Sequence, residues 1–231
     1  MILYETIFTR RQVRSFTDAA PDTQVLDDIL TCVQEAEQIS GQHARFELVS
    51  ASEVSGDQGA SHYLLSFCEA NSAAYANVGY VLQKVDLYIQ SQGLGSGWFM
   101  SAKPKKAAAD FCIALAFGET EEPTRKSEAE FKRKPLEEIC ADKNSIARAV
   151  RLAPSSLNSQ PWKLRMESER AVIEDAGKGF TRLILKNKLN KIDIGIAARH
   201  AVLALEQEGK TVTQVLAFEE GKKFEIQILF Y

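Results

Sequence analysis

The sequence predicts an α+β fold in which two similar units of one chain surround a common sheet core. Two long helical patterns repeat at an offset of 116 residues, so that Asn77-Val78-Gly79 aligns with Asp193-Ile194-Gly195. Strand-like segments precede and follow both helices in the same order. At 231 residues and 25.7 kDa, the chain is long enough to bury a core without disulfides or a metal.

Composition narrows the class of protein. Hydrophobic residues make up 45% and charged residues 26%, as in ordinary globular proteins. The net charge of -3 offers no general electrostatic reason to bind nucleic acid or an anionic membrane. The first twelve residues carry Glu5, Arg10 and Arg11 without a long apolar run, and no membrane-length apolar stretch follows. We therefore expect a cytoplasmic protein without nucleic-acid or membrane partners.

Cysteine and histidine spacing gives no sign of a metal or a nucleophile. Four cysteines lie far apart without a C-x-x-C pair, and the three histidines are equally dispersed. Small buried thiols in a reducing compartment are the expectation. We predict no metal site and no catalytic side chain.

The first unit, residues 1–140, begins with a short apolar segment and an arginine cluster. A helix opens at Pro21-Asp22, and 46–51 is typical of a strand, whereas 62–68 is ambiguous. A long helix is expected over 77–92, ending at Gly93. The continuous apolar run 111–117 predicts a strand buried on both faces. A polar, exposed excursion over 118–134 then leads to a short helix at 135–139.

The second unit, residues 141–231, predicts a helix over 144–152, a polar turn from Pro154, and a hairpin after Trp162. A long helix over 193–208 and two final strands, joined at Glu220-Gly221, complete it. The repeat extends beyond the helices, because Gln42–Phe46 aligns with Gln160–Leu164. Ile113–Phe117 likewise aligns with Ile226–Phe230. The alternative is chance similarity between two amphipathic helices.

Two segments carry candidate binding chemistry. Arg10, Arg11 and Arg14 form a local cationic cluster whose planar guanidinium groups could bind a phosphate, with Lys132-Arg133-Lys134 as a second basic group. The alternative is a solvated face. The polar turn 153–162 is rich in short hydrogen-bonding side chains, which can terminate a helix or line a planar, polar-edged ligand. GLGSGW is no dinucleotide fingerprint, because it follows a helix.

Four segments together resemble the FMN-dependent nitroreductase superfamily: RRQVRSF, APSSLNSQPW, GLGSGW and FKRKPLEEI. The resemblance covers most of the chain, and APSSLNSQPW is its most specific part. It implies a nitroreductase-like fold with a central, mostly antiparallel sheet and flanking helices. In that family two subunits intertwine and bind FMN at their interface. Here the two units would form such a pair within one chain, so we expect a monomer that acts as a pseudo-dimer.

The resemblance implies a role for each matching residue. Arg10, Arg11 and Arg14 would hold the phosphate and reach the flavin ring, with Arg133 and Lys132 assisting at the phosphate. The ring would be contacted from the other unit by Pro154, Ser155, Ser156 and Asn158. Its remaining edge would be lined by Gly95, Ser96, Gly97 and Trp98.

The order of the motifs departs from the family pattern. In unit one, residues 36–40 occupy the PS-x-x-N position and place Glu37 there, while unit two lacks its own arginine opening and basic segment. One combined site, and hence one FMN per chain, is the expectation. Gln12 also replaces the usual serine, which leaves a phosphate contact in doubt.

The implied activity is an FMN-dependent oxidoreductase that takes hydride from NAD(P)H and reduces an electron-poor acceptor such as a nitroaromatic or a quinone. Two alternatives remain open. A degenerate family member would bind flavin weakly or not at all and serve a binding or structural role. Flavin could also be a substrate instead of a bound cofactor.

Overall fold

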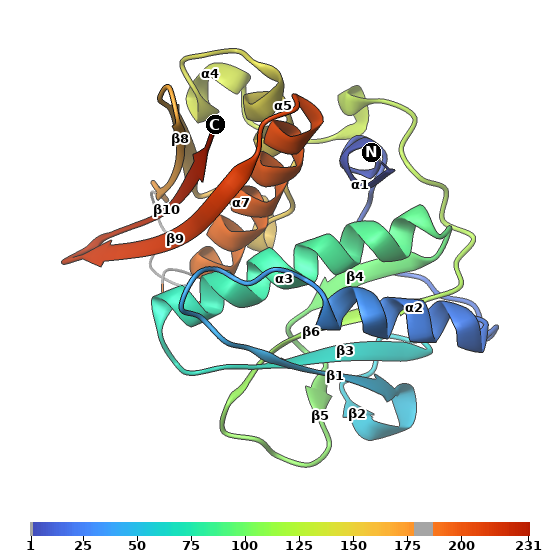
Figure 1. Cartoon of the computed structure of the whole chain (residues 1–231). Coiled ribbons are helices and arrows are strands. Elements are labelled where there is room, and N and C mark those ends of the chain that lie inside the picture. The colour runs from blue at the N-terminus through green and yellow to red at the C-terminus, as the bar shows by residue number, and fades with distance from the viewer. Residues whose placement is uncertain (1, 178–186) are drawn as a thin grey trace.

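A computed structural model describes residues 2–177 and 187–231 of the chain. Two four-stranded antiparallel sheets dominate it (Figure 1). The first has the strand order β1-β3-β6-β4, with β1 at Arg45–Ser50, β3 at His62–Phe67, β6 at Phe111–Gly118 and β4 at Gly95–Phe99. The second has the order β7-β8-β10-β9, with β7 at Trp162–Met166, β8 at Arg170–Asp175, β10 at Lys223–Phe230 and β9 at Val212–Glu220.

The two sheets have the same topology. In chain order β7, β8, β9 and β10 take the places of β1, β3, β4 and β6, and each unit inserts its long helix after its second main strand. The mixed class with antiparallel strands and flanking helices is confirmed. The strands, however, form two sheets instead of one common sheet. The reason is that the two long helices pack against each other and fill the space between the sheets.

Helices α3 (Ser72–Ser91) and α7 (Leu189–Gln207) form the centre of the molecule, and most of their residues are buried. Both begin earlier than the expected 77 and 193. Asn71 caps α3 by accepting a hydrogen bond from the Ala74 amide at 2.8 Å, a signal outside the repeated segment. A single cluster of buried apolar side chains surrounds the two helices and includes residues of both sheets.

The crossing of α3 and α7 depends on two glycines. A Cβ on Gly79 would lie 2.0 Å from the carbonyl oxygen of Ile192, and one on Gly195 would lie 1.8 Å from that of Ala76. The two contacts are equivalent, because Gly79 corresponds to Gly195, and Ala76 to Ile192, at the same offset of 116. Such reciprocity is the pattern of a two-fold interface, here within one chain. Glycine lets the backbones approach more closely than any other residue allows.

The remaining elements cover the core. They are α1 (Ile2–Thr6), α2 (Thr23–Gln34), α4 (Leu136–Ile139), α5 (Ser145–Arg151), the small sheet of β2 (Val54–Ser55) with β5 (Lys103–Pro104), and the 3-10 turns η1 (Ala51–Glu53), η2 (Glu128–Glu130) and η3 (Ser156–Asn158). The ambiguous segment 62–68 is mostly strand, and strand β4 begins within GLGSGW, at Gly95. The excursion 118–134 is exposed or partly exposed except at Gly118 and Phe131, which are buried.

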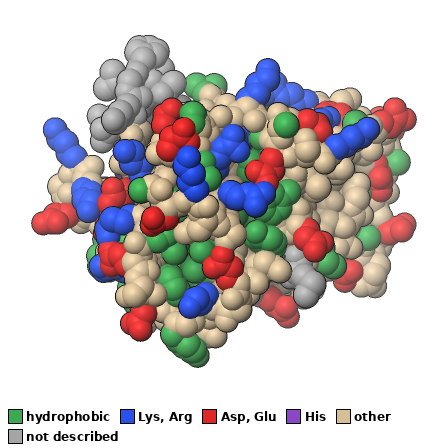
Figure 2. All heavy atoms as spheres, turned by 90° about the horizontal axis from the view of Figure 1, so that it is seen from above, with side chains coloured by type: hydrophobic (Ala, Val, Ile, Leu, Met, Phe, Trp, Pro, Cys, Tyr) green, Lys and Arg blue, Asp and Glu red, His purple; other side chains and the backbone are tan. Residues whose placement is uncertain are grey.

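Neither sign of charge dominates the face of the molecule seen in Figure 2. Figure 2 shows Lys and Arg side chains interspersed with Asp and Glu over the face seen from above. Among the described helices, none combines the length and apolar character needed to cross a membrane. Of the cysteines, Cys68, Cys112 and Cys140 are buried and Cys32 is partly exposed, and all four are free thiols.

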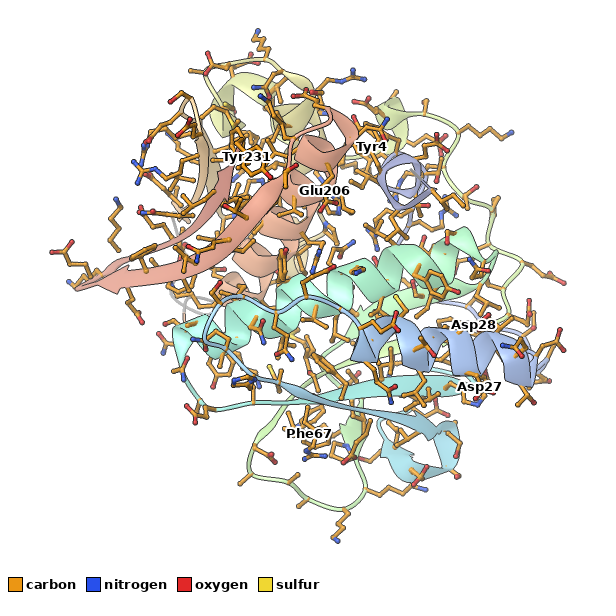
Figure 3. All side chains as sticks on the ribbon, viewed as in Figure 1. Tyr4, Asp27, Asp28, Phe67, Glu206 and Tyr231 are labelled. Carbon is orange, nitrogen blue, oxygen red and sulfur yellow. The ribbon has the colours of Figure 1, made fainter. Side chains whose placement is uncertain are left out.

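A second, smaller apolar cluster lies on the other face of the first sheet. Alternate residues of β3 divide between the two faces: Leu64 packs in the main core, whereas Tyr63, Leu65 and Phe67 pack in the smaller cluster. Figure 3 shows Phe67 on the side of the sheet away from α3. This strand is therefore buried on both faces, which explains its nearly continuous apolar sequence.

Candidate functional site

A cavity of about 990 Å³ is lined by residues of both units. Its walls come from the arginine segment, the end of β4 and the loop that follows it, the segment 125–133, the turn 154–158, and the start of α7. This volume is at the upper end of the usual range for small-molecule and cofactor sites. The cavity therefore has the size expected for a ligand as large as a nucleotide cofactor.

Most of the residues predicted to bind the cofactor line this cavity. They are Arg10, Arg14, Trp98, Lys132, Arg133, Pro154, Ser155, Ser156 and Asn158. The others do not, namely Arg11, Gly95, Ser96 and Gly97. The structure thus brings together the arginine opening and the polar turn, although more than a hundred residues separate them in the sequence.

The β4 glycines serve the arginine segment instead of the cavity. A Cβ on Gly97 would lie 2.6 Å from the Val13 carbonyl oxygen, and one on Gly95 would lie 2.9 Å from the Val13 side chain. The Val13 amide donates to Ser96 O at 2.9 Å. Gln12 adds two bonds to the Trp98 backbone, donating to its carbonyl at 3.1 Å and accepting from its amide at 3.0 Å. The amide of Gln12 is therefore used to fix the arginine segment on β4.

Arg10 and Arg11 are engaged in structural contacts. The Arg10 guanidinium is buried and forms an ion pair with Asp86 of α3 at 2.9 Å. Asp86 also accepts from Ser96 Oγ at 2.6 Å, which extends this buried network into β4. The Arg11 side chain lies 3.7 Å from Glu122, outside the cavity. Arg10 thus presents part of a neutralised pair to the cavity, while Arg14 is exposed at its edge.

Two further guanidinium groups form the least compensated charge in the cavity. Arg125 and Arg133 lie over the ring of Phe131, at 4.2 Å and 5.5 Å from its centroid. Within the described residues neither forms an ion pair, and the buried Arg133 Nε has no hydrogen-bond partner. Burial, together with Arg10, Arg125 and Arg151, lowers the pKa of Arg133 to about 9. Burial and the neighbouring Arg10 and Arg11 also lower the pKa of Arg125.

A bound anion would stabilise this cluster of cations. Partly buried cations that repel one another and have no acidic partner cost free energy unless a ligand supplies the negative charge. The carboxylate of Glu130, close to Arg125 in the sequence, lines the same cavity. Its effect in raising the pKa of Arg125 is smaller than the lowering by burial, Arg10 and Arg11. A phosphate dianion fits the fork geometry of paired guanidinium groups.

The polar turn is strained and is held by the basic segment. Leu157, Asn158 and Gln160 all have positive φ, at 52°, 54° and 47°. Asn158 accepts from Arg133 Nη1 at 2.8 Å and donates to Lys132 O at 2.8 Å. Gln160 accepts from the Lys134 amide at 2.8 Å. Left-handed backbone at non-glycine residues concentrates at functional sites, where surrounding contacts enforce it.

Helix α7 contributes a buried carboxyl group and an apolar wall. Asp193 is 2% exposed, and both its oxygens accept from the Ser156 amide at 3.1 Å. Burial, and the nearby Asp175, raise the pKa of Asp193 well above its usual value. Ile192 and Ile196 line the cavity beside it. The carboxyl group therefore anchors the polar turn on the helix.

The corresponding position in unit one holds no such site. At the offset of 116, Asn77 replaces Asp193 and accepts from the Ile39 amide at 2.8 Å, while Tyr80 replaces Ile196. Tyr80 is buried, and Arg199 stacks on its ring at 3.6 Å. Arg199 also donates to the Glu37 carbonyl at 3.0 Å. Tyr80 and Arg199 thus pack against each other, and neither lines the 990 Å³ cavity.

A smaller cavity, of about 260 Å³, lies beside Lys134, Gln160 and Trp162. None of the predicted site residues lines it, so it is separate from the candidate site. Within the described residues, no group of three or more His, Cys, Asp or Glu side chains could hold a metal ion.

Comparisons with known proteins give the family. The family described as "Putative TM nitroreductase" matches residues 2–205, which is most of the chain. This chain belongs to that nitroreductase family. Membership places it among the oxidoreductases. No curated protein matches the chain.

Several solved structures are similar to this chain over part or nearly all of its length. A "putative nitroreductase" of Thermotoga maritima is 20% identical, with a TM-score of 0.72, and the match covers 99% of this chain and 94% of that chain. A nitroreductase family protein of Clostridium difficile covers 60% of this chain and 95% of its own, at 16% identity and a TM-score of 0.48. A "putative nitroreductase" of Desulfovibrio desulfuricans in complex with FMN covers 58% and 96%, at 19% identity and a TM-score of 0.43. The first of these confirms the nitroreductase-like fold.

Sequence reasoning missed three kinds of cavity residue. Arg125 lies in a polar segment with no recognisable motif, and Met100 follows GLGSGW without a pattern of its own. Asp193 lies in the repeated helix and aligns with Asn77, so an ionisable side chain is present at this position in the second unit only. That difference between aligned positions was the signal available for finding it.

Proposed function

We propose that this protein is an FMN-dependent oxidoreductase that accepts hydride from NAD(P)H and reduces an electron-poor acceptor such as a nitroaromatic or a quinone. The flavin would lie in the 990 Å³ cavity, between the arginine segment of unit one and the polar turn of unit two. The observation that carries this proposal is the uncompensated Arg125–Arg133 pair in a cavity of cofactor size.

The residues present fit an FMN molecule. Arg133 and Arg125, with Lys132 and Arg14 at the edge, would hold the phosphate, and each charge-assisted bond contributes about 1.5 to 3 kcal/mol. The orphaned Nε of Arg133 is a donor in need of an acceptor. Ile192 and Ile196 supply an apolar wall for a planar ring. Trp98 and the backbone of the polar turn would face the ring edges.

Bound flavin supplies the redox chemistry by accepting and passing on a hydride. The contribution of the protein is binding and electrostatic stabilisation. Cations and backbone amides around the cavity favour the negative charge of a reduced, anionic ring. Asp193 fixes the Ser156 amide and hence the position of the turn. No side chain needs to act as a nucleophile.

We further propose that the two units, 1–140 and 141–231, act as an internal pseudo-dimer with one flavin. The matching strand orders and the reciprocal glycine contacts support the pairing of units. The buried Arg199 and Tyr80 at the mirror position support a single site. The protein would then be monomeric and would bind one FMN per chain.

The decisive experiment is a titration of apoprotein with FMN, followed by flavin fluorescence, with riboflavin as the matched ligand that lacks the phosphate. Binding of one FMN per chain, much tighter than riboflavin, is the expected result. Reduction of the bound flavin by NADPH or NADH, and its reoxidation by a quinone or a nitroaromatic, completes the assignment. A protein that binds neither flavin would instead be a degenerate member with a binding or structural role. An endpoint of two per chain would refute the single-site arrangement.

A further inference from the structure

One apolar side chain at the candidate site is both largely exposed and held on a strained backbone. Leu157, in the middle of the polar turn, is 68% exposed and has a φ of 52°. A branched apolar residue rarely adopts this left-handed conformation, which costs about 1 kcal/mol or more. It also gains nothing there from burial.

Side-chain hydrogen bonds account for the left-handed backbone of Asn158 and Gln160, but no such bond accounts for that of Leu157. Asn158 shares its left-handed backbone but is a residue that tolerates it, and both ends of its side chain are hydrogen-bonded to the basic segment. Gln160 is bonded through its side chain to the Lys134 amide. Asn or Gly at position 157 would satisfy the same backbone with less strain. The apolar side chain is therefore the feature that needs an explanation.

A second exposed apolar side chain lines the same cavity from the other unit. Met100, in the loop after β4, is 54% exposed, and Phe99 and Trp98 precede it. Because Leu157 and Met100 are both exposed and both line the cavity, they lie at its opening. Arg133 and Arg125 line the same cavity and are only partly exposed. Leu157 and Met100 thus supply an apolar side chain from each unit at the opening, beside the exposed charged groups of Arg14, Glu130 and Lys132.

We propose that Leu157 and Met100 determine acceptor specificity by gripping the apolar ring system of a planar acceptor at the opening of the cavity. The acceptor class is a fused-ring quinone or a nitroaromatic of similar size, in preference to a single small ring. Thioether and branched aliphatic side chains suit this role, since they pack on flat apolar surfaces without demanding hydrogen bonds. This inference rests on the proposed flavin function and adds the substrate class to it.

The test is Leu157→Asn, which keeps the side-chain size close and suits a left-handed backbone. We measure the KM for two acceptors that differ by one fused ring, 1,4-benzoquinone and 2-methyl-1,4-naphthoquinone. We also measure binding of the larger quinone to the flavin-loaded, oxidised protein without NAD(P)H. Leu157→Asn should weaken KM and Kd for the larger quinone about five- to tenfold, with little change for benzoquinone. The melting temperature should stay equal or rise by about 2 °C because strain is relieved.

Controls separate this role from a general defect. Leu157→Met keeps an apolar side chain and should retain the parent's preference for the larger quinone. Phe218→Asn removes an exposed apolar residue on β9, outside the cavity, and should leave both constants unchanged. Met100→Gln should shift the larger quinone in the same direction as Leu157→Asn.

Two outcomes would overturn the inference. If Leu157→Asn leaves Kd and KM for the larger quinone unchanged, the residue does not contact the acceptor. If it lowers the melting temperature by several degrees, Leu157 has a packing role and its strain has a structural cause. A parent protein that binds no flavin would refute the proposed function first, and this inference with it. A parent that binds flavin and shows no effect at position 157 would refute only the inference.

Discussion

Alanine at Gly195 should force the two central helices apart. The new Cβ would lie 1.8 Å from the carbonyl oxygen of Ala76, 2.7 Å from its carbonyl carbon and 2.9 Å from the Tyr80 amide nitrogen. All three are backbone atoms of α3, so no change of rotamer can relieve the contact. Ordinary van der Waals contact begins at 3.4 Å, so α3 and α7 must separate by about 1.5 Å at the crossing.

Two opposing effects set the magnitude. Overpacking of a core costs about 1–3 kcal/mol, and a backbone contact belongs at or above the upper limit. A separation of about 1.5 Å also removes more than half of the dispersion attraction across the crossing. Alanine in a helix gains up to about 1 kcal/mol over glycine. The net loss should be at least about 2 kcal/mol, or about 4–8 °C in melting temperature for a chain of this length.

The assay is urea unfolding of the Gly195→Ala variant and of its mate, Gly79→Ala, followed by far-UV circular dichroism. Both single changes should destabilise by similar amounts, since each places a Cβ within 2.0 Å of a carbonyl oxygen of the other helix. The double variant should lose less than the sum, because either alanine alone already separates the helices. Flavin affinity should fall too, because α7 carries Asp193 on the cavity wall. A neutral or stabilising Gly195→Ala, or strictly additive losses, would refute the close crossing.

Three further predictions concern individual ionisable groups. Arg125→Gln should weaken FMN binding at least about tenfold and leave riboflavin unaffected, whereas the exposed Arg45→Gln should change neither; equal losses for both ligands would show that Arg125 does not face the phosphate. Burial raises the pKa of Asp193 in the folded state above its ordinary 3.8, so its contribution is fully present below that pH and is lost as pH rises through the raised pKa. Asp193→Asn should therefore gain melting temperature relative to the parent as pH rises above 3.8, and a difference that does not change with pH would contradict this. Burial lowers the pKa of His200 from 6.5 to about 3, so stability is fully present above pH 6.5 and is lost as pH falls toward 3, by on the order of 5 kcal/mol. His200→Asn, which can still donate to the Ala149 carbonyl, should flatten this acid loss, and an unchanged acid profile would exclude His200 as its source.

The sequence predicted the elements whose signals are local. Helices α2, α5 and α7 and the final hairpin follow from apolar periodicity and turn residues, and their boundaries lie within a few residues of the structure. The repeat aligned Gly79 with Gly195, but their role at the helix crossing was not predicted and is a finding of the structure. The division into two sheets could not be predicted, because it depends on α3 and α7 packing together instead of lying on one shared sheet.

Three predicted site residues have tertiary neighbours that the local sequence does not reveal. Gly95 and Gly97 were expected to face a ligand, because a glycine permits a close approach without indicating the partner. Both lie against Val13 of the arginine segment, and Gly95 also lies against the Thr120 side chain. Arg10, expected to bind a phosphate, lines the cavity, but it also pairs with the buried Asp86, 76 residues away in the sequence. Contacts of this kind are set by tertiary packing, and local sequence carries no record of them.

The candidate site is best explained by the side chains that differ between aligned positions of the two units. Both long helices use the same position, Asn77 or Asp193, to hold the backbone of the segment that precedes a strand. One turn further along, Tyr80 fills the space in unit one, whereas the smaller Ile196 leaves a cavity in unit two. Beside Tyr80, Arg199 forms an ion pair with Glu37. Beside the cavity, Arg125 and Arg133 have no acidic partner to compensate their charge. If the chain binds one flavin, as we propose, these few differences are sufficient to distinguish the two sides of the helix pair.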